Sequence, residues 1–208
     1  NNGDSWFSIN EGLFVLTVNS IAQGGAQILA GTSRRIHSTT DMGESWIELI
    51  NGLPNVLVTS TVSVGSYLFA ATDGSGIYIS TNNGADWTQL YYQLEFSQIR
   101  AMVKKGTTLF ASSVGSGVYR ATDLGATWNL MINGLANATT VNCLFVSGDN
   151  IIAGASGGKV SISTNNGQSW VVSSSGLPEV PINAIAGIAN QIFVGTNGQG
   201  AFVSNNNG

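Results

Sequence analysis

Carboxylates and arginines are the side chains of this sequence that could cleave or bind a polar ligand. Hydrolysis of a glycosidic bond needs two carboxyl groups that face each other across the bond. Most of the eleven acids lie in turns, and four of them could reach one face of the molecule: Glu11, Asp73, Glu95 and Glu179. The arginines are Arg34, Arg35, Arg100 and Arg120. Arg100 and Arg120 fall in different strand-like segments, so the sequence does not predict a cluster of arginines.

The remaining reactive residues are isolated. His37 has no serine, acid or second histidine at a catalytic or metal-binding spacing, which favours a half-exposed strand residue. Cys143 is the single cysteine and lies in the apolar run VNCLFV, where it is expected to be buried. The Gly-x-Gly turns precede no helix that could bind phosphate, and the turn at Asp73 lacks the second acid of a calcium site. We therefore expect no metal and no cofactor.

Composition excludes several classes of function. Charged residues make up 9% of the chain, against about 25% in average soluble domains, and the net charge is −4. Nucleic-acid binding needs clustered Lys and Arg, and this chain has seven in all. No apolar run approaches the roughly 18 residues of a membrane span. The low charge and single cysteine are typical of secreted bacterial proteins, so we expect an extracellular or periplasmic location, although this chain shows no signal peptide.

A recurring eight-residue marker organises all of these groups. It reads TTDMGESW at 39–46, STNNGADW at 80–87, ATDLGATW at 121–128 and STNNGQSW at 163–170. The tryptophans, at positions 6, 46, 87, 128 and 170, follow one another with a period of about 41 residues. A period of this size indicates a solenoid, a propeller or an array. No linker or charge run interrupts it, which predicts one domain over residues 1–208.

Each repeat contains four segments with strand character. In the second repeat these are 57–64, 67–72, 77–80 and about 86–91, each bounded by a turn signal such as Gly65-Ser66 or Asn82-Asn83-Gly84. The segment YLFAAT at 67–72 is apolar on both faces, which predicts a buried strand. The order of segments and short turns predicts a four-stranded antiparallel meander in every repeat.

The marker itself has a structural explanation. Its Asn or Asp can accept hydrogen bonds from backbone N–H groups, its Gly can take a positive φ, and its Trp can cover the seam between two sheets. The residues expected in these structural roles are Asp41, Gly43, Trp46, Asn82, Gly84, Trp87, Asp123, Gly125, Trp128, Asn165, Gly167, Trp170 and, in the first copy, Trp6.

The two ends of the chain carry complementary parts of the marker. Residues 1–6 read NNGDSW, its back half, and residues 204–208 read SNNNG, its front half. Pairing of the N-terminal strand with the C-terminal sheet would close a ring without free edges. We therefore expect an all-β, five-bladed β-propeller of four-stranded blades, monomeric if the ring closes and oligomeric if it does not. The repeated Asn-Asn-Gly suggests a segment trimmed from a longer repeat protein or engineered from one.

The pattern Ser/Thr-x-Asp-x-Gly-x-x-Trp resembles the Asp-box, or BNR, repeat of sialidases, sortilin-type receptors, xyloglucan hydrolases and a photosystem assembly factor. The resemblance covers the whole chain and is greatest to uncharacterised secreted bacterial repeat proteins. It implies a β-propeller in which the box is a structural device away from any active site. A sialidase would also need three converging arginines and a tyrosine paired with an acid, which this sequence does not predict.

The face opposite the markers is the expected binding face, because the repeats differ there. The candidate ligand-binding residues are Arg34, Arg35, Asp73, Tyr92, Glu95, Phe96 and Gln199. Exposed aromatic rings beside polar groups suit a protein or a carbohydrate. We expect a non-catalytic binding or scaffold module. Two alternatives remain open, namely a sialidase-like glycoside hydrolase and a purely structural repeat fragment without a ligand.

Overall fold

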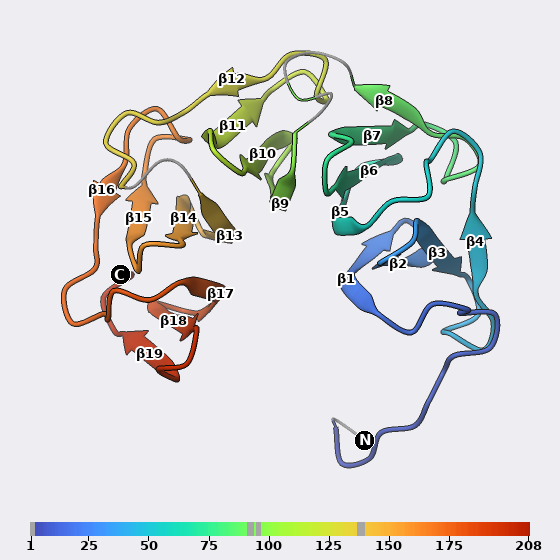
Figure 1. Ribbon diagram of the computed structural model, residues 1–208, viewed down its shortest axis with the longest axis horizontal. Coiled ribbons are helices and arrows are strands. Elements are labelled where there is room, and N and C mark those ends of the chain that lie inside the picture. The colour runs from blue at the N-terminus through green and yellow to red at the C-terminus, as the bar shows by residue number, and fades with distance from the viewer. Residues whose placement is uncertain (1–2, 91–93, 95–96, 137–139) are drawn as a thin grey trace.

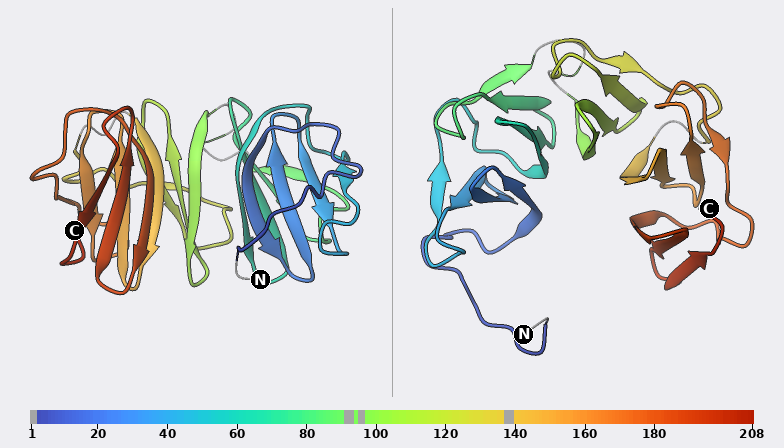
Figure 2. Two further views of the ribbon diagram at one scale, coloured as in Figure 1. Left: turned by 90° about the horizontal axis from the view of Figure 1, so that it is seen from below. Right: turned by 180° about the vertical axis from the view of Figure 1, so that it is seen from behind.

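The computed structural model of the protein describes residues 3–90, 94, 97–136 and 140–208. These residues form nineteen β-strands in five antiparallel sheets and no helix, which confirms the expected all-β class. The sheets stand around a central channel in chain order, and we call them blades 1 to 5 (Figure 1). Figure 2 shows their strands running along the axis of that channel.

The strand bounds repeat from blade to blade. Blade 1 holds β1 (Val18–Gly24), β2 (Gln27–Thr32), β3 (Ile36–Thr39) and β4 (Ile47–Leu49). Blade 2 holds β5 (Val58–Val64), β6 (Tyr67–Thr72), β7 (Ile77–Ser80) and β8 (Thr88–Leu90). Blade 3 holds β9 (Ile99–Lys105), β10 (Thr108–Ser113), β11 (Gly117–Ala121) and β12 (Asn129–Leu130). Blade 4 holds β13 (Val141–Ser147), β14 (Asn150–Ala155), β15 (Val160–Ser163) and β16 (Val171–Val172). Blade 5 holds β17 (Ile182–Ile188), β18 (Gln191–Thr196) and β19 (Ala201–Ser204).

Each marker forms a tight turn before the outermost strand of its blade. In blade 1, an Asp41 carboxylate oxygen accepts hydrogen bonds from the Ser45 N–H at 3.0 Å and from the Thr39 hydroxyl at 2.6 Å. In blade 2, the Asn82 side-chain oxygen accepts the Asp86 N–H at 2.9 Å. The amide oxygen of Asn82 thus accepts the same backbone hydrogen bond as the carboxylate oxygen of Asp41, so the Asn/Asp variation between copies leaves the turn intact.

In blades 2, 3 and 4, the tryptophan after the turn fills the seam between its own blade and the preceding one. Trp128 is 1% exposed and packs with Phe69 and Ile77 of blade 2 and with Leu94 in the link between the blades. Trp87 and Trp170 lie in matching clusters one blade before and one blade after. The core of the molecule is therefore a series of seams, each shared by two neighbouring blades.

The ring is not closed by its own N-terminal strand, contrary to the sequence-based expectation. Blade 5 has three strands, and the described residues before Val18 form none. The N-terminal segment extends away from β19, and an opening separates blade 5 from blade 1 (Figure 1).

The physical reason for the opening lies in the seams between blades. The indole N–H of Trp46 donates to the carbonyl oxygen of Ile9 at 2.7 Å, and the Trp46 N–H donates to that of Glu11 at 2.8 Å. Trp170 makes the same two bonds, to Met131 and Asn133, although the strand just before them, β12, is paired in blade 3. These bonds therefore do not cause the opening. The packed seams between blades set an arc that leaves its two ends apart (Figure 1).

Candidate functional site

A hollow of about 670 Å³ lies at the end of the channel where the links between blades and the turns between second and third strands are found. We call this end the link face. All five blades contribute to the hollow, which is therefore the mouth of the channel. Its lining residues are Asn19, Leu57, Thr59, Asp73, Arg100, Thr140, Asn142, Ser156, Pro181 and Asn183.

A β-bulge at the same place in every innermost strand aims one side chain at this mouth. In each blade the register shifts after the first residue of the strand, so that the second residue has no partner across the ladder. Such bulges re-aim side chains and are frequent near functional sites. The bulged residues are Asn19, Thr59, Arg100, Asn142 and Asn183.

Three of the five bulged side chains bond to the next blade. Asn19 donates to the carbonyl oxygen of Val58 at 3.3 Å, Thr59 to that of Ile99 at 2.6 Å, and Asn142 to that of Ile182 at 3.0 Å. Each of these bonds joins the start of one innermost strand to the start of the next. These side chains consequently fix the spacing of the blades around the mouth.

Arg100 is a bulged residue whose side chain does not bond to the next blade. Its side chain is exposed, and its guanidinium makes no hydrogen bond or ion pair with the described residues. Arginine is a planar, permanently charged donor that pairs well with carboxylates and with backbone carbonyl groups. Arg100 therefore places an available cation among bulged side chains that are otherwise neutral amides and a hydroxyl.

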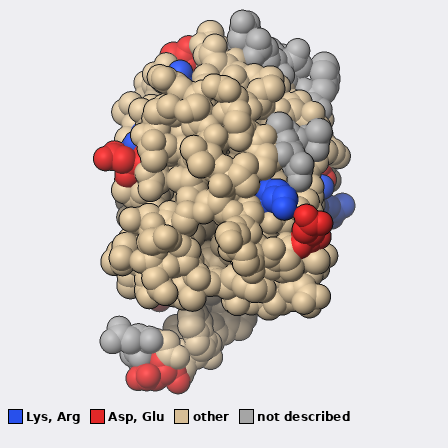
Figure 3. Space-filling view, turned by 90° about the vertical axis from the view of Figure 1, so that its left-hand side faces the viewer, with Lys and Arg blue, Asp and Glu red and all other residues tan. Residues whose placement is uncertain are grey.

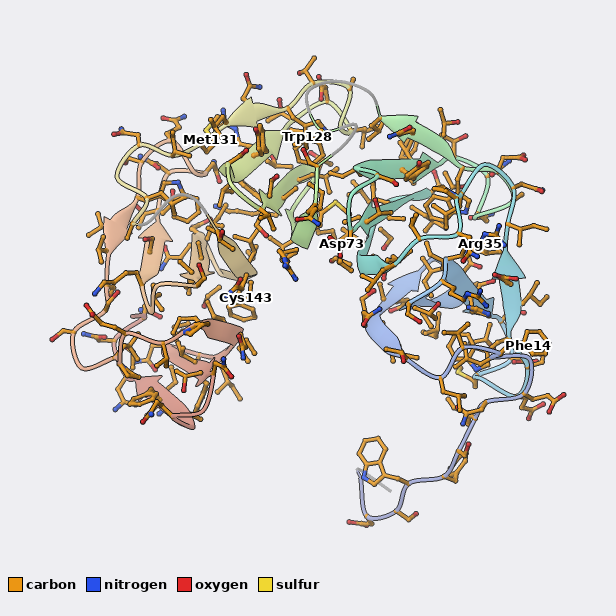
Figure 4. The ribbon with its side chains drawn as sticks, viewed as in Figure 1. Phe14, Arg35, Asp73, Trp128, Met131 and Cys143 are labelled. Atoms are coloured by element: carbon orange, nitrogen blue, oxygen red, sulfur yellow. The ribbon has the colours of Figure 1, made fainter. Side chains whose placement is uncertain are left out.

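Asp73 supplies the negative charge of the same hollow. It directly follows β6, its N–H donates to the carbonyl oxygen of Leu57 at 3.0 Å, and it forms an isolated bridge with Gln98. These backbone contacts fix its position while its half-buried side chain lines the hollow. Figure 4 shows Asp73 on the channel side of the molecule. Of the acids expected on this face, it alone lines the hollow within the described part of the chain.

The other candidate ligand-binding residues lie elsewhere. Arg35 has φ 64°, pairs with Glu48 at 3.4 Å and donates to the Leu53 carbonyl oxygen at 3.2 Å, so its guanidinium is used within blade 1. Arg34 and Gln199 are exposed in turns of blades 1 and 5 and do not line the hollow. Tyr92, Glu95 and Phe96 lie outside the described residues.

The other acids and arginines do not assemble a second centre among the described residues. Glu179 pairs with Lys159 at 3.3 Å, and Arg120 donates to the Asn166 carbonyl oxygen at 2.9 Å. No group of three His, Cys, Asp or Glu suitable for a metal ion occurs in that part of the chain. It also contains no helix long and apolar enough to cross a membrane. Figure 3 shows a face on which charged side chains are few and scattered.

His37 is buried rather than half-exposed as the sequence suggested. Its side chain is 1% exposed, and neither ring nitrogen has a hydrogen-bond partner among the described residues. Burial lowers the pKa of His37, and the nearby Glu48 opposes this effect. The imidazole is therefore held neutral inside blade 1, away from the hollow.

Sequence reasoning missed the bulged residues. A usable signal was present, because every innermost strand begins with a β-branched apolar residue followed by a polar one: VN, VT, IR, VN and IN. The sequence could not show that the second residue leaves the ladder, since a bulge depends on the register of the neighbouring strand.

Comparison with known proteins supports the fold. No family model and no curated protein sequence matches the chain. The similar solved structures are β-propellers. They include the computationally designed Ika8 protein, with 15% identity, a TM-score of 0.70, and coverage of 92% of this chain and 59% of that one. The structure described as YCF48 bound to D1 peptide has 18% identity and a TM-score of 0.69, with coverage of 92% of this chain and 64% of that one. The GH74 enzyme of Niastella koreensis has 16% identity and a TM-score of 0.65, with coverage of 91% of this chain and 30% of that one.

The chain thus spans less than two thirds of the length of each of these three proteins. The identities are low, so the likeness concerns the fold alone. It establishes that the five sheets are blades of a β-propeller.

Proposed function

We propose that the protein is a non-catalytic binding or scaffold module of the Asp-box type and that the hollow at the link face receives a segment of a protein partner. The observation that carries this proposal is the ring of five bulged polar residues, of which Arg100 is charged, together with the neighbouring Asp73 in the same hollow. A rim of amides and hydroxyls can bond to peptide groups, while the two charges orient the ligand.

The Arg100 side chain favours a ligand with a carboxylate or exposed carbonyl groups, and Asp73 favours an ammonium or N–H donor nearby. A peptide offers both kinds of group along one chain. One neighbour, YCF48, is described as bound to D1 peptide, which is a property of that protein but supports a peptide as the first ligand class to test. A carbohydrate is the second class, since hydroxyl groups also suit an amide-lined rim.

A sialidase-like glycoside hydrolase is the alternative from a different class. The GH74 neighbour is an enzyme, but its likeness is at the level of fold, and fold does not determine activity. Hydrolysis would need a second carboxyl group facing Asp73. A structural repeat without a ligand is the remaining alternative.

Binding assays on peptide and glycan arrays, combined with hydrolysis assays on aryl glycosides, test the proposal. We expect saturable peptide binding without turnover, weakened about tenfold or more by Arg100→Ala, since a charge-assisted hydrogen bond contributes about 1.5–3 kcal/mol. Arg34→Ala is the matched control, because it removes an exposed arginine of the same face outside the hollow.

Turnover of a glycoside that Asp73→Asn abolishes would replace the proposal with the hydrolase alternative. The absence of both binding and turnover in all the assays would favour a structural repeat without a ligand. An extracellular or periplasmic location is part of the proposal, and fractionation of the source cells checks it.

A further inference from the structure

Asn-Gly pairs recur along the chain, and they are sites where an asparagine side chain can turn into a carboxylate without an enzyme. The backbone nitrogen of the glycine attacks Cγ of the asparagine, and this approach is open because glycine has no Cβ. The N–Cγ bond forms, the Cγ–Nδ2 bond breaks, and the amide group leaves with the proton of the glycine nitrogen as ammonia. Water then opens the succinimide ring to Asp or iso-Asp. Six pairs lie wholly within the described residues, at 51–52, 83–84, 133–134, 166–167, 197–198 and 207–208.

Three of these pairs lie in marker turns, where the attacking nitrogen is already bonded. The asparagine of each has a φ of 57–66°. The N–H of the following glycine donates to the hydroxyl of the first serine of the marker, from Gly84 to Ser80 at 2.8 Å, from Gly167 to Ser163 at 2.8 Å and from Gly208 to Ser204 at 2.9 Å. Gly84 and Gly167 are also buried. The nitrogen can reach the side chain only after this bond breaks and the turn opens.

Two further pairs lie in links between blades, where the next blade holds the backbone. The carbonyl oxygen of Asn51 accepts the N–H of Trp87 at 2.9 Å, and that of Asn133 accepts the N–H of Trp170 at 2.8 Å. A Cβ added at the glycine of either pair would collide with the backbone oxygen of the same tryptophan. These backbones cannot turn toward the asparagine side chain unless the link leaves the blade.

The pair Asn197–Gly198 is free of such restraints. It lies in the exposed turn between β18 and β19, and neither the Asn197 side chain nor the Gly198 N–H makes a hydrogen bond with the described residues. A Cβ added at Gly198 would meet no atom within 4 Å. The matching Gly74 of blade 2, which packs between two other blades, has the same open surroundings. The freedom of Gly198 therefore comes from the turn and not from the place of blade 5 in the arc.

The position of Asn197 is the one that Asp73 holds in blade 2. Each residue directly follows the second strand of its blade and precedes a Gly-x-Gly turn. The N–H of Asp73 donates to the carbonyl oxygen of Leu57, and that of Asn197 to the carbonyl oxygen of Pro181 at 2.8 Å. Both acceptor residues line the hollow at the link face. A carboxylate at position 197 would thus stand on the same face as Asp73, at the equivalent point of another blade.

We propose that Asn197 is a site of self-modification, at which attack by the Gly198 nitrogen converts the side-chain amide into a carboxylate in the folded protein. The marker and link pairs keep their amides because their backbones are held. The reaction needs only water, and it adds one negative charge to the link face. This face therefore becomes more acidic as the protein ages, whether or not a ligand binds.

Asn166 provides a control within the same molecule, because both asparagines are followed by the same residues, Gly-Gln. Their intrinsic reactivity is therefore closely matched, and the fold distinguishes them. Chymotrypsin cuts after Phe193 and Phe202, so the fragment 194–202 contains Asn197 as its single asparagine. Mass spectrometry of a digest measures the conversion at each site after incubation of the protein in mildly alkaline buffer.

We expect Asn197 to convert at least about tenfold faster than Asn166 in the folded protein, since the marker turn must first open locally. In guanidinium chloride the two rates should agree within about twofold, because the chain is unfolded. Anion-exchange chromatography should show a more acidic form of the folded protein that grows with incubation. Asn197→Gln should remove this form, since the longer side chain closes the ring far more slowly.

Ser163→Ala tests the cause of the protection at Asn166. It removes the hydroxyl that accepts the Gly167 N–H, and the fold tolerates alanine there because Ala121 holds the same position in the marker of blade 3. Conversion at Asn166 should become about fivefold faster, which is the effect of losing one hydrogen bond, while conversion at Asn197 should not change. Circular dichroism checks that the variant is folded.

Equal conversion of Asn197 and Asn166 in the folded protein would overturn the proposal. A preference for Asn197 that persists in guanidinium chloride would overturn it too, because the local sequence would then explain the difference. So would a Ser163→Ala chain in which Asn166 converts as slowly as before. The outcome does not depend on the binding hollow, since no ligand is used.

Discussion

The Thr59 hydroxyl donates a hydrogen bond of 2.6 Å to the carbonyl oxygen of Ile99, and so joins the innermost strands of blades 2 and 3 at the mouth of the channel. The bond exists because a bulge turns Thr59 out of its own ladder. The same device recurs at Asn19 and Asn142. Blade spacing and the shape of the hollow at the link face therefore depend on the same residues.

Replacing Thr59 with valine tests this tie between blades. The substitution keeps the branched shape but removes the hydroxyl, leaving the partly buried carbonyl oxygen of Ile99 without its donor. We expect a loss of about 1 kcal/mol in the free energy of unfolding, measured with urea. Asn183→Ala is the control, since this exposed bulge residue has no following blade to contact, and it should change stability by less than about 0.5 kcal/mol. Equal losses of unfolding free energy in the two variants would show that the hydrogen bond from Thr59 to Ile99 does not stabilise the fold.

Trp128 should be among the most costly side chains to truncate. It is 1% exposed and fills the seam between blades 2 and 3 together with Phe69 and Leu94. Trp128→Ala should therefore destabilise the protein by about 3–5 kcal/mol in urea unfolding. Phe14→Ala, at a site 87% exposed (Figure 4), should cost less than about 0.5 kcal/mol. A small effect at Trp128 would mean that the seams do not carry the stability of the fold.

The thiol of Cys143 should resist labelling in the folded protein. Burial raises the pKa of Cys143 to about 12, so almost no thiolate exists at pH 8. The Sγ atom also contacts the carbonyl oxygens of Gly154 and Ile182 at 3.9 Å. We expect a disulfide reagent such as Ellman's to react on the order of 100-fold more slowly with the native protein than with urea-unfolded protein. Fast labelling without urea would show that the seam between blades 4 and 5 opens readily.

Stability should fall in acid because two marker carboxylates lose their hydrogen bonds on protonation. The Ser45 hydroxyl is the largest of the influences that lower the pKa of Asp41, and the Thr127 hydroxyl is the largest for Asp123. Their ordinary pKa is 3.8. A carboxyl group whose pKa is lower in the folded chain stabilises the fold above that ordinary value. This contribution is lost as the pH falls through the folded-state value.

The melting temperature should therefore decrease as the pH drops below about 4, as scanning calorimetry from pH 7 to pH 2 would show. The melting temperature of the double variant Asp41→Asn, Asp123→Asn should decrease less over the same pH range. The reason is that an amide accepts the hydrogen bond of the turn without titrating, as Asn82 does in blade 2. Identical pH profiles for the variant and the unmodified protein would contradict this explanation.

Much of the blade was predictable from local signals. The expected strands at 67–72 and 77–80 match β6 and β7, because glycine-rich turns and apolar runs mark both ends. The last strand was expected to begin at Asp86 but begins at Thr88, since the marker turn extends through Trp87, and its expected end at Tyr91 lies outside the described residues. Of the predicted ligand-binding residues, Asp73 lines the hollow, whereas Arg35 bonds within blade 1. The sequence around Arg35 does not show that its guanidinium pairs with Glu48, because that partner comes from another strand.

The sequence by itself determined where each blade begins and ends, since Gly, Asn or Asp and Trp at fixed spacing act through bonds inside one turn. Only the tertiary structure decided two larger features. It left Trp6 exposed and the arc open, because the angle between blades comes from packing across seams such as that of Phe69 and Met102. It also placed Arg100 in the channel mouth, because the bulge that aims it arises from the register between β9 and β10.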